Sequence, residues 1–169
     1  MIIQLNAHNA ASYIEQLSGL LQDAVNGGAS VGFLSPLSMN EATAYWRSVE
    51  ASLGEGLIAW VALEEGRVVG AVQLSLCMKA NGLHRGEVQK LFVLQTHRGR
   101  GIAQELMAEL EGFALRHERT LLVLDTEADS VAESLYQRLS WLRVGEIPSY
   151  AKSPAGVLRA TALYYKLLK

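Results

Sequence analysis

The feature that most constrains this fold is a strand that passes through a short basic glycine loop into a helix. Residues 86–94 are predicted as a strand, residues 97–101 carry two arginines and two glycines, and residues 102–117 show apolar side chains at helical spacing. A short apolar run at 121–125 then predicts a second strand. Strand, helix and strand in this order form a crossover, which places the two strands parallel and is nearly always right-handed.

The remaining segments predict antiparallel strands around this crossover. Residues 57–63 and 67–76 are apolar runs joined by Glu64-Glu65-Gly66, which has the length and the glycine of a hairpin turn. We further expect a strand at Ile2–Leu5, helices at 9–25, 38–53 and 130–140, and strands near 142–148 and 158–168. The sequence shows neither an internal repeat nor a Pro/Gly/Ser-rich linker. We therefore predict one α/β domain, residues 1–169, with a mixed, mostly antiparallel sheet flanked by helices.

Composition narrows the classes of function. The lone Cys77 cannot form an intrachain disulfide, and the four histidines are scattered without metal-ligand spacing, so we expect no metal. The net charge of -2 gives no general attraction to nucleic acid or to anionic membranes. No apolar stretch is long enough to span a bilayer, and the N-terminus lacks the blocks of a signal peptide, so we expect a cytoplasmic location. The apolar content is compatible with a homodimer.

The loop at residues 97–101 has the properties of an anion-binding site. Unpaired N–H groups and the positive end of the helix dipole converge where this loop enters the helix. Gly99 and Gly101 let the main chain approach an anion closely, and Arg98 and Arg100 can bind it through bidentate contacts. A glycine turn with two solvated arginines would use the same residues, but the strand-loop-helix context favours a pyrophosphate ligand.

Two nucleotide-binding folds compete for this loop. A Walker loop requires Lys followed by Ser or Thr after its last glycine, whereas Gly101 is followed by Ile102 and Ala103, so this fold is excluded. A dinucleotide-binding unit is the closer rival, because Asp125 ends an apolar strand about 24 residues after Gly101, where a ribose-binding acid falls. However, Gln104 stands in place of the third glycine, and the preceding hairpin does not begin a doubly wound sheet. A nucleotide-dependent oxidoreductase is therefore the rival enzyme class.

The run Arg98-Gly99-Arg100-Gly101-Ile102-Ala103 resembles the Q/R-x-x-G-x-G/A signature of the GNAT superfamily of N-acetyltransferases. Ala132, Leu135, Tyr136 and Leu139-Ser140-Trp141 resemble a second family segment, and the similarity covers the topology from Ile2 to Leu168. The resemblance implies direct transfer of an acetyl group from acetyl-CoA to an amine, at a splayed pair of parallel strands. It also implies that the following residues contact acetyl-CoA: Leu91, Phe92 and Val93 through a strand bulge, then Arg98, Gly99, Arg100, Gly101, Ile102, Ala103, Gln104 and Asp129. Asp129 and Ser140 depart from the family, in which many members carry asparagine and glycine at these positions.

Within this superfamily the chain resembles the tabtoxin-resistance acetyltransferases, which acetylate a small amine-bearing β-lactam toxin. The similar segments are Gly28–Phe33, Glu87–Leu94 and Leu124–Glu127. The resemblance implies a small-molecule primary amine as the acceptor, with Phe33 and Glu87 in contact with it. It also implies that Glu87 or Asp125 removes the proton that an amine must lose before it attacks a thioester. From the residues alone, Glu87 is a solvent-facing strand acid and Asp125 a strand-end cap.

Tyr136 is the candidate for the acid that protonates the departing thiolate. Its spacing from Ala132, Leu135 and Leu139 also fits an ordinary core-facing helix stripe, so the assignment as an acid comes from the resemblance. A CoA-binding domain without catalytic activity is the remaining alternative to an enzyme.

Overall fold

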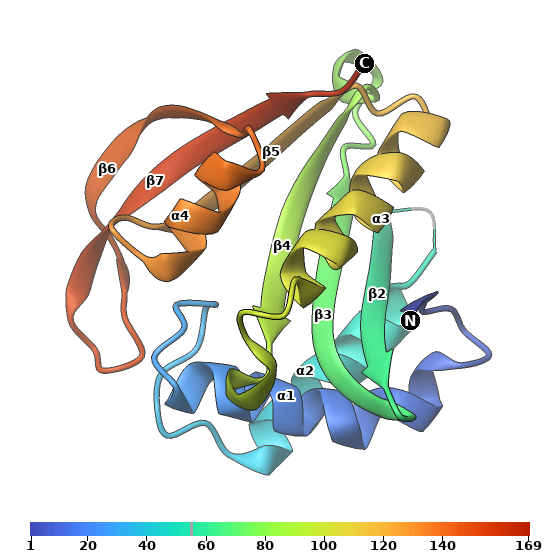
Figure 1. Cartoon of the computed structure of the whole chain (residues 1–169), viewed down its shortest axis with the longest axis vertical. Coiled ribbons are helices and arrows are strands. Elements are labelled where there is room, and N and C mark those ends of the chain that lie inside the picture. The colour runs from blue at the N-terminus through green and yellow to red at the C-terminus, as the bar shows by residue number, and fades with distance from the viewer. Residues whose placement is uncertain (55) are drawn as a thin grey trace.

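The computed structural model describes residues 1–54 and 56–169 and contains one seven-stranded sheet (Figure 1). The strands follow the order β1-β2-β3-β4-β5-β7-β6, and only β4 and β5 pair in parallel among the described residues. The strands are β1 (Ile2–Gln4), β2 (Leu57–Glu64), β3 (Arg67–Leu76), β4 (Arg85–Val93), β5 (Leu121–Glu127), β6 (Leu142–Lys152) and β7 (Leu158–Leu167). This mixed, mostly antiparallel sheet confirms the predicted fold class.

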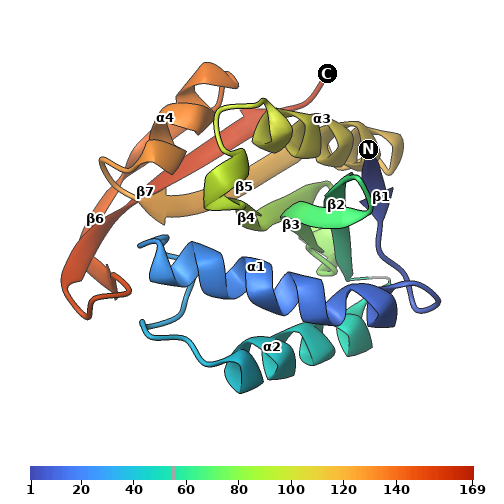
Figure 2. The same cartoon turned by 60° about the horizontal axis from the view of Figure 1, so that its bottom comes forward.

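Helices cover both faces of the sheet and create a hydrophobic core on each. Figure 2 shows α1 (Ile14–Asn26) and α2 (Met39–Ser52) on one side, and α3 (Ile102–Arg116) with α4 (Val131–Arg138) on the other. The α1–α2 core gathers around Trp46 and Phe92, and the α3–α4 core gathers around Trp60 and Leu110. No helix in the described part of the chain is long and apolar enough to cross a membrane.

Strand β4 carries the two irregularities that shape the middle of the molecule. Its pairing with β3 shifts from Ala71↔Phe92 to Gln73↔Gln89, so β4 has one extra residue there, a β-bulge. Lys90 lies in this bulge with φ 53°, the left-handed region that side-chain-bearing residues seldom adopt. On its other edge β4 pairs with β5 only over three residues, Arg85–Glu87 with Leu121–Val123. The two strands then diverge, as predicted for the parallel pair (Figure 1).

Three predicted elements differ from the structure at their ends. The helix expected at 9–25 begins as a 3₁₀ turn over Ala10–Tyr13 before α1 starts. The helix expected at 130–140 is shorter, because the chain turns out of α4 through Ser140 at φ 63°. Strand β6 runs on to Lys152 beyond the expected end, with its register shifted between Ile147 and Ala151, because an edge strand tolerates Pro148 and an irregular stretch.

Candidate active site

The loop before α3 has the main-chain geometry of an anion site. Gly99 has φ 76°, and Gly101, the N-cap of α3, has φ 84° without a side-chain hydrogen bond to the helix. At both glycines a Cβ would meet nothing within 4 Å, so the backbone conformation, and not crowding, requires glycine. The first turn follows with Ile102 and Ala103 partly buried and Gln104 exposed. Uncapped N–H groups at this helix start fit a diphosphate group.

The two arginines of this loop are held differently. Arg98 donates from Nε to the Val93 carbonyl oxygen at 3.3 Å, which ties it to the end of β4. Arg100 lies 3.3 Å from Oε2 of Glu64 and donates to the Thr96 carbonyl oxygen at 3.4 Å. The Arg100 guanidinium therefore braces the loop against the β2–β3 hairpin, and Arg98 is the more available of the two cations.

The bulge of β4 lies immediately before this loop and includes the backbone that the sequence assigns to the cofactor. The side chains of Phe92 and Val93 are buried, and Leu91 is partly buried. The Phe92 ring packs edge-on against Trp46, with ring centroids 6.3 Å apart. These side chains anchor the strand, while the bulge interrupts its regular hydrogen-bond ladder to β3.

Glu87 and Asp125 face the same side of the sheet on neighbouring strands. Glu87 pairs with Val123, and Asp125 follows two residues later, so both side chains point toward the α1–α2 side. Gln89 donates from Nε2 to Oε1 of Glu87 at 3.0 Å and orients that carboxylate. Partial burial raises the pKa of Asp125, and the negative charge of Glu87 raises it further, whereas the Lys90 ammonium lowers it. The structure thus brings together the two acids that the sequence singled out.

Tyr136 lies on the other side of the sheet, in the α3–α4 core. Its side chain is buried against Trp141 and Tyr164. Of the predicted core-facing stripe, Leu139 also packs against this core, whereas Ala132 is exposed. Burial, and then the negative charge of Asp125, raise the pKa of Tyr136 well above its ordinary value. Its hydroxyl makes no hydrogen bond with the described residues. Tyr136 therefore stays protonated at neutral pH and is electrostatically coupled to Asp125.

A buried acid fixes the start of α4 beside Tyr136. Glu133 accepts hydrogen bonds from the Asp129 N–H and the Tyr164 hydroxyl, each at 2.6 Å, and from Nε of Arg143 at 2.9 Å. These hydrogen bonds outweigh the effect of burial and lower the pKa of Glu133. Asp129 itself is exposed and lies in the left-handed region at φ 59°. Its main-chain N–H is held by Glu133, whereas its side chain makes no hydrogen bond with the described residues.

Four residues that we call the Lys90 cluster, Phe33, Tyr45, Gln73 and Lys90, gather on the α1–α2 side near the two acids. The Phe33 and Tyr45 rings meet edge-on with centroids 5.3 Å apart, and the Tyr45 hydroxyl donates to Oε1 of Gln73 at 3.1 Å. Nζ of Lys90 lies 5.9 Å from the centroid of the Tyr45 ring. Only Phe33 was predicted from the sequence. Gln73, a buried amide inside an apolar strand, was the signal that sequence reasoning overlooked.

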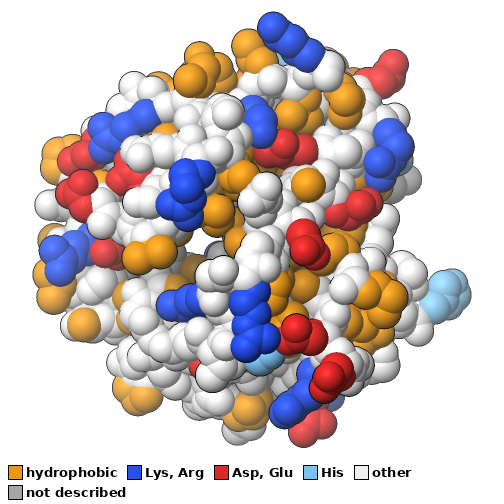
Figure 3. Space-filling model, in the orientation of Figure 1, with side chains coloured by type: hydrophobic (Ala, Val, Ile, Leu, Met, Phe, Trp, Pro, Cys, Tyr) orange, Lys and Arg blue, Asp and Glu red, His pale blue; other side chains and the backbone are white. Residues whose placement is uncertain are grey.

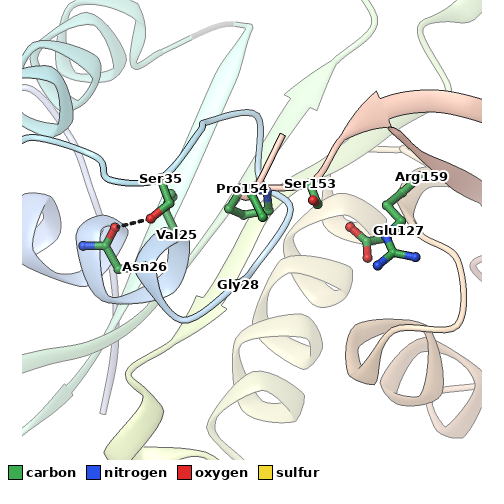
Figure 4. A pocket seen from close by; sticks show the side chains of 9 residues that line it. Val25, Asn26, Gly28, Ser35, Glu127, Ser153, Pro154 and Arg159 are labelled. Atoms are coloured by element: carbon green, nitrogen blue, oxygen red, sulfur yellow. Dashed lines mark hydrogen bonds between the residues drawn. The ribbon is translucent and has the colours of Figure 1, made fainter. Parts of the chain in front are cut away.

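A pocket of about 290 Å³ opens between the loop after α1 and the β6–β7 turn (Figure 4). Gly28 and Ser35 line one side, and Ser153 and Pro154 line the other. The Ser35 N–H donates to the Pro154 carbonyl oxygen at 2.9 Å, so the two loops are joined. Figure 4 shows Glu127 and Arg159 side by side at one end, and we call this space the Glu127 pocket. In the space-filling view the molecule is hollowed between β4 and the part that carries α4 (Figure 3).

Solved structures share this architecture. The chain superposes on an N-acetyltransferase from Staphylococcus aureus Mu50 with a TM-score of 0.79 and 20% identity, covering 100% of this chain and 98% of the other. A putative acetyltransferase from Salmonella typhimurium, solved with its cofactor acetyl-CoA, gives a TM-score of 0.76 at 17% identity and covers 100% and 94%. These similarities support the fold, which is not the doubly wound parallel sheet of the rival oxidoreductase class.

Sequence comparison identifies the family. An N-acetylaspartate synthetase from Danio rerio is 34% identical over 96 residues, which is 56% of this chain and 33% of the relative. The match thus spans only about a third of the length of that relative. Residues 27–141 match the acetyltransferase (GNAT) family. They include the β4 bulge, α4 and the loop at residues 97–101, which we call the phosphate loop after the ligand predicted for it. The chain therefore belongs to the acetyltransferase (GNAT) family.

Proposed function

We propose that this enzyme transfers the acetyl group of acetyl-CoA directly to the primary amine of a small molecule. One observation carries the proposal. Strand β4 carries Glu87 and the bulge with Lys90, and one short loop then connects it to the uncapped start of α3. Donor binding would then involve β4, and acceptor deprotonation would involve β4 and its parallel neighbour β5, so that paired strands align the two reactants.

The donor would be held mainly by main-chain groups. The N–H groups of Gly99 to Gln104 fit the CoA diphosphate, and Arg98 adds positive charge. The backbone of Leu91 to Val93 would pair with the pantetheine arm like an added strand. A main-chain N–H at this bulge would also stabilise the oxyanion that forms during transfer. Asp129 would lie at the far side of the same arm.

The acids on the acceptor side would remove the proton of the amine. Free α-amines have a pKa of about 7.7 to 8, so a large share arrives protonated at neutral pH. Partial burial and the negative charge of Glu87 raise the pKa of Asp125, and Glu87 lies beside it with Gln89 as its orienting partner, so both carboxylates are candidate bases. The proton would pass to Asp125 or Glu87, directly or through a water molecule.

Tyr136 would supply the proton for the leaving group. Acetyl-CoA supplies the acetyl thioester, whose C–S bond breaks as the new C–N bond forms. The Tyr136 hydroxyl is protonated at neutral pH and has no competing hydrogen bond among the described residues, so it can donate to the departing sulfur. Its burial in the α3–α4 core fixes the position of the ring.

The acceptor would be a small amine that enters from the α1–α2 side. The Glu127 pocket, of about 290 Å³, has the size of a small-molecule site and is lined by residues of the loop after α1 and of β5, the strand that also carries Asp125. The name of one relative, N-acetylaspartate synthetase, refers to an N-acetylated amino acid, which supports a small amine as the acceptor. The β-lactam toxin implied by the tabtoxin-resistance resemblance belongs to the same class, and Phe33 and Glu87 would contact it.

Calorimetry with CoA and acetyl-CoA, followed by a thiol-release assay with a panel of amines, tests this proposal. The panel should contain amino acids, polyamines, amine-bearing antibiotics and peptides, with a reaction without acceptor as the control for hydrolysis. We expect CoA binding and thiol release with at least one small amine, and a product heavier by one acetyl group. Absence of CoA binding, or activity on peptides alone, would contradict the proposal.

A further inference from the structure

Lys90 places an unpaired positive charge on the acceptor side of the enzyme. Its side chain is half-buried, yet its ammonium makes neither an ion pair nor a hydrogen bond with residues 1–54 or 56–169. Burial lowers its pKa, and the charges of Asp125 and Glu87 oppose this effect. A partly desolvated cation is costly unless it is paired, so this ammonium is suited to an anionic partner from outside the chain.

A second donor without a partner belongs to Gln73, which contacts Tyr45, the residue whose ring lies under Lys90. Gln73 is only 2% exposed, and its Oε1 accepts the Tyr45 hydroxyl. Its Nε2 is buried and has no hydrogen-bond partner among the described residues. Buried polar groups are nearly always hydrogen-bonded, so an orphaned amide donor also calls for an acceptor oxygen. Both residues contact Tyr45: Gln73 accepts the hydrogen bond of its hydroxyl through Oε1, and Lys90 lies over its ring.

The backbone holds Lys90 in this place at some cost. Lys90 is in the left-handed region, and the extra residue of the β4 bulge is what displaces it from the regular strand. Its Nζ lies against Gly32, where a Cβ would be 3.5 Å away, and Gly32 has φ 93°. A non-glycine residue held in an unfavourable conformation beside a site is a recognised sign of a functional constraint.

We propose that the acceptor is an amine that also carries a carboxylate, and that Lys90 and Gln73 bind this carboxylate while Glu87 and Asp125 face the amine. The inference rests on the proposed function and narrows its substrate class to amino acids and similar zwitterions. The Lys90 ammonium complements a carboxylate, and the Glu87 and Asp125 carboxylates complement an ammonium, so the site suits a molecule that carries both groups. A polyamine would instead bring a second cation toward Lys90.

Matched acceptors test this inference. Each amino acid in the panel should be compared with its carboxamide, and each ω-amino acid with the alkylamine of the same length. We expect the wild-type enzyme to prefer the carboxylate form roughly ten- to a hundred-fold in kcat/KM, the range for a hydrogen bond to a charged group. Lys90→Met should abolish most of this preference through KM, and Lys90→Arg should retain part of it. Gln73→Glu, which adds a negative charge in nearly the same shape, should weaken carboxylate acceptors alone.

The controls separate this inference from the proposed function. Lys79→Met removes an exposed lysine in the loop before β4 and should leave the preference unchanged. A thermal unfolding midpoint of Lys90→Met close to that of the wild-type enzyme would show that the variant folds, and the wild-type ratio of carboxylate to carboxamide is informative even if it does not. If neutral amines react as well as carboxylates in the wild-type enzyme, the inference is wrong and the proposed function stands. If no amine releases thiol, both are wrong.

Discussion

The phosphate loop and the Lys90 cluster are built on the same strand in two different ways. The loop is one continuous segment that follows β4, and the groups proposed to bind the cofactor are main-chain N–H groups shaped by two glycines. The Lys90 cluster draws one side chain each from the loop before α2, from α2, from β3 and from β4. A continuous main-chain site suits a group that never varies, whereas side chains on separate elements can change one at a time and so adjust the choice of acceptor.

The largest expected effect lies at Tyr136, which belongs to neither region and lies in the α3–α4 core. Tyr136→Phe removes the only proton that this ring can donate and keeps the packing against Trp141 and Tyr164. Since general acid catalysis contributes about 10² to 10⁴ in rate, we expect kcat to fall at least roughly 100-fold while the CoA affinity stays the same. Steady-state kinetics with calorimetry measures both quantities.

A matched variant separates chemistry from packing at Tyr136. Tyr164→Phe also removes a hydroxyl from the α3–α4 core, but this hydroxyl donates to Glu133 and not into the site. It should lower thermal stability more than Tyr136→Phe and change kcat less. Equal losses of kcat in the two variants would contradict the acid role of Tyr136.

The second expected effect tests whether the main-chain conformation of the phosphate loop determines the affinity for CoA. Gly101→Val places a β-branched residue at φ 84°, which costs about 1 to 2 kcal/mol, and about 1.4 kcal/mol is a factor of ten in affinity. We expect roughly tenfold weaker CoA binding by calorimetry, with the preference among acceptors unchanged. Gly19→Ala, in the middle of α1 where a Cβ meets nothing within 4 Å, is the control and should leave CoA binding intact.

The phosphate loop was easier to predict from the sequence than the Lys90 cluster, because the loop is one continuous segment and the cluster combines four separate elements. The glycine loop, the crossover and the parallel pair follow from local residue order, so the strand-loop-helix unit was predicted within a few residues. Glu87 and Asp125 could be paired because they belong to the two strands of one crossover. Lys90, Tyr45 and Gln73 come together only because of the β4 bulge and the packing of α2. Neither the bulge nor this packing produces a periodic pattern in the sequence. The bracing of Arg100 by Glu64 depends likewise on a hairpin that is distant in sequence.

The third prediction concerns the two acids and the direction of a pH shift. Asp125 must be unprotonated to act as a base, so kcat/KM should fall as the pH drops through its raised pKa. Glu87→Gln removes the neighbouring negative charge, which lowers the pKa of Asp125 and should move this acid limb to lower pH. Lys90→Met removes the opposing positive charge and should move the limb to higher pH. The pH dependence of kcat/KM, measured with one acceptor in all three proteins, checks both directions.

The outcome also distinguishes which acid carries the proton. A Glu87→Gln variant that remains active with a shifted limb assigns the base to Asp125. A loss of roughly 100-fold or more at every pH, with the limb in its original position, would assign it to Glu87 and contradict the expected link between the acid limb and Asp125.

The smallest expected effect concerns Ser140, at the end of α4, where many members of the family carry glycine. Ser140 lies at φ 63°, a conformation that costs a side-chain-bearing residue about 1 kcal/mol, and it is exposed. Ser140→Gly should therefore stabilise the fold by roughly 0.5 to 1 kcal/mol, after allowance for the greater freedom of glycine in the unfolded chain. Ser134→Gly, at an exposed position inside α4, should do the opposite by a similar amount. Denaturant unfolding measures both, and a destabilised Ser140→Gly would mean that the serine hydroxyl makes a contact worth more than the strain it relieves. Because neither change reaches the phosphate loop or the Lys90 cluster, CoA affinity and acceptor preference should stay constant, so that the strain at Ser140 affects the stability of α4 and not the chemistry beside it.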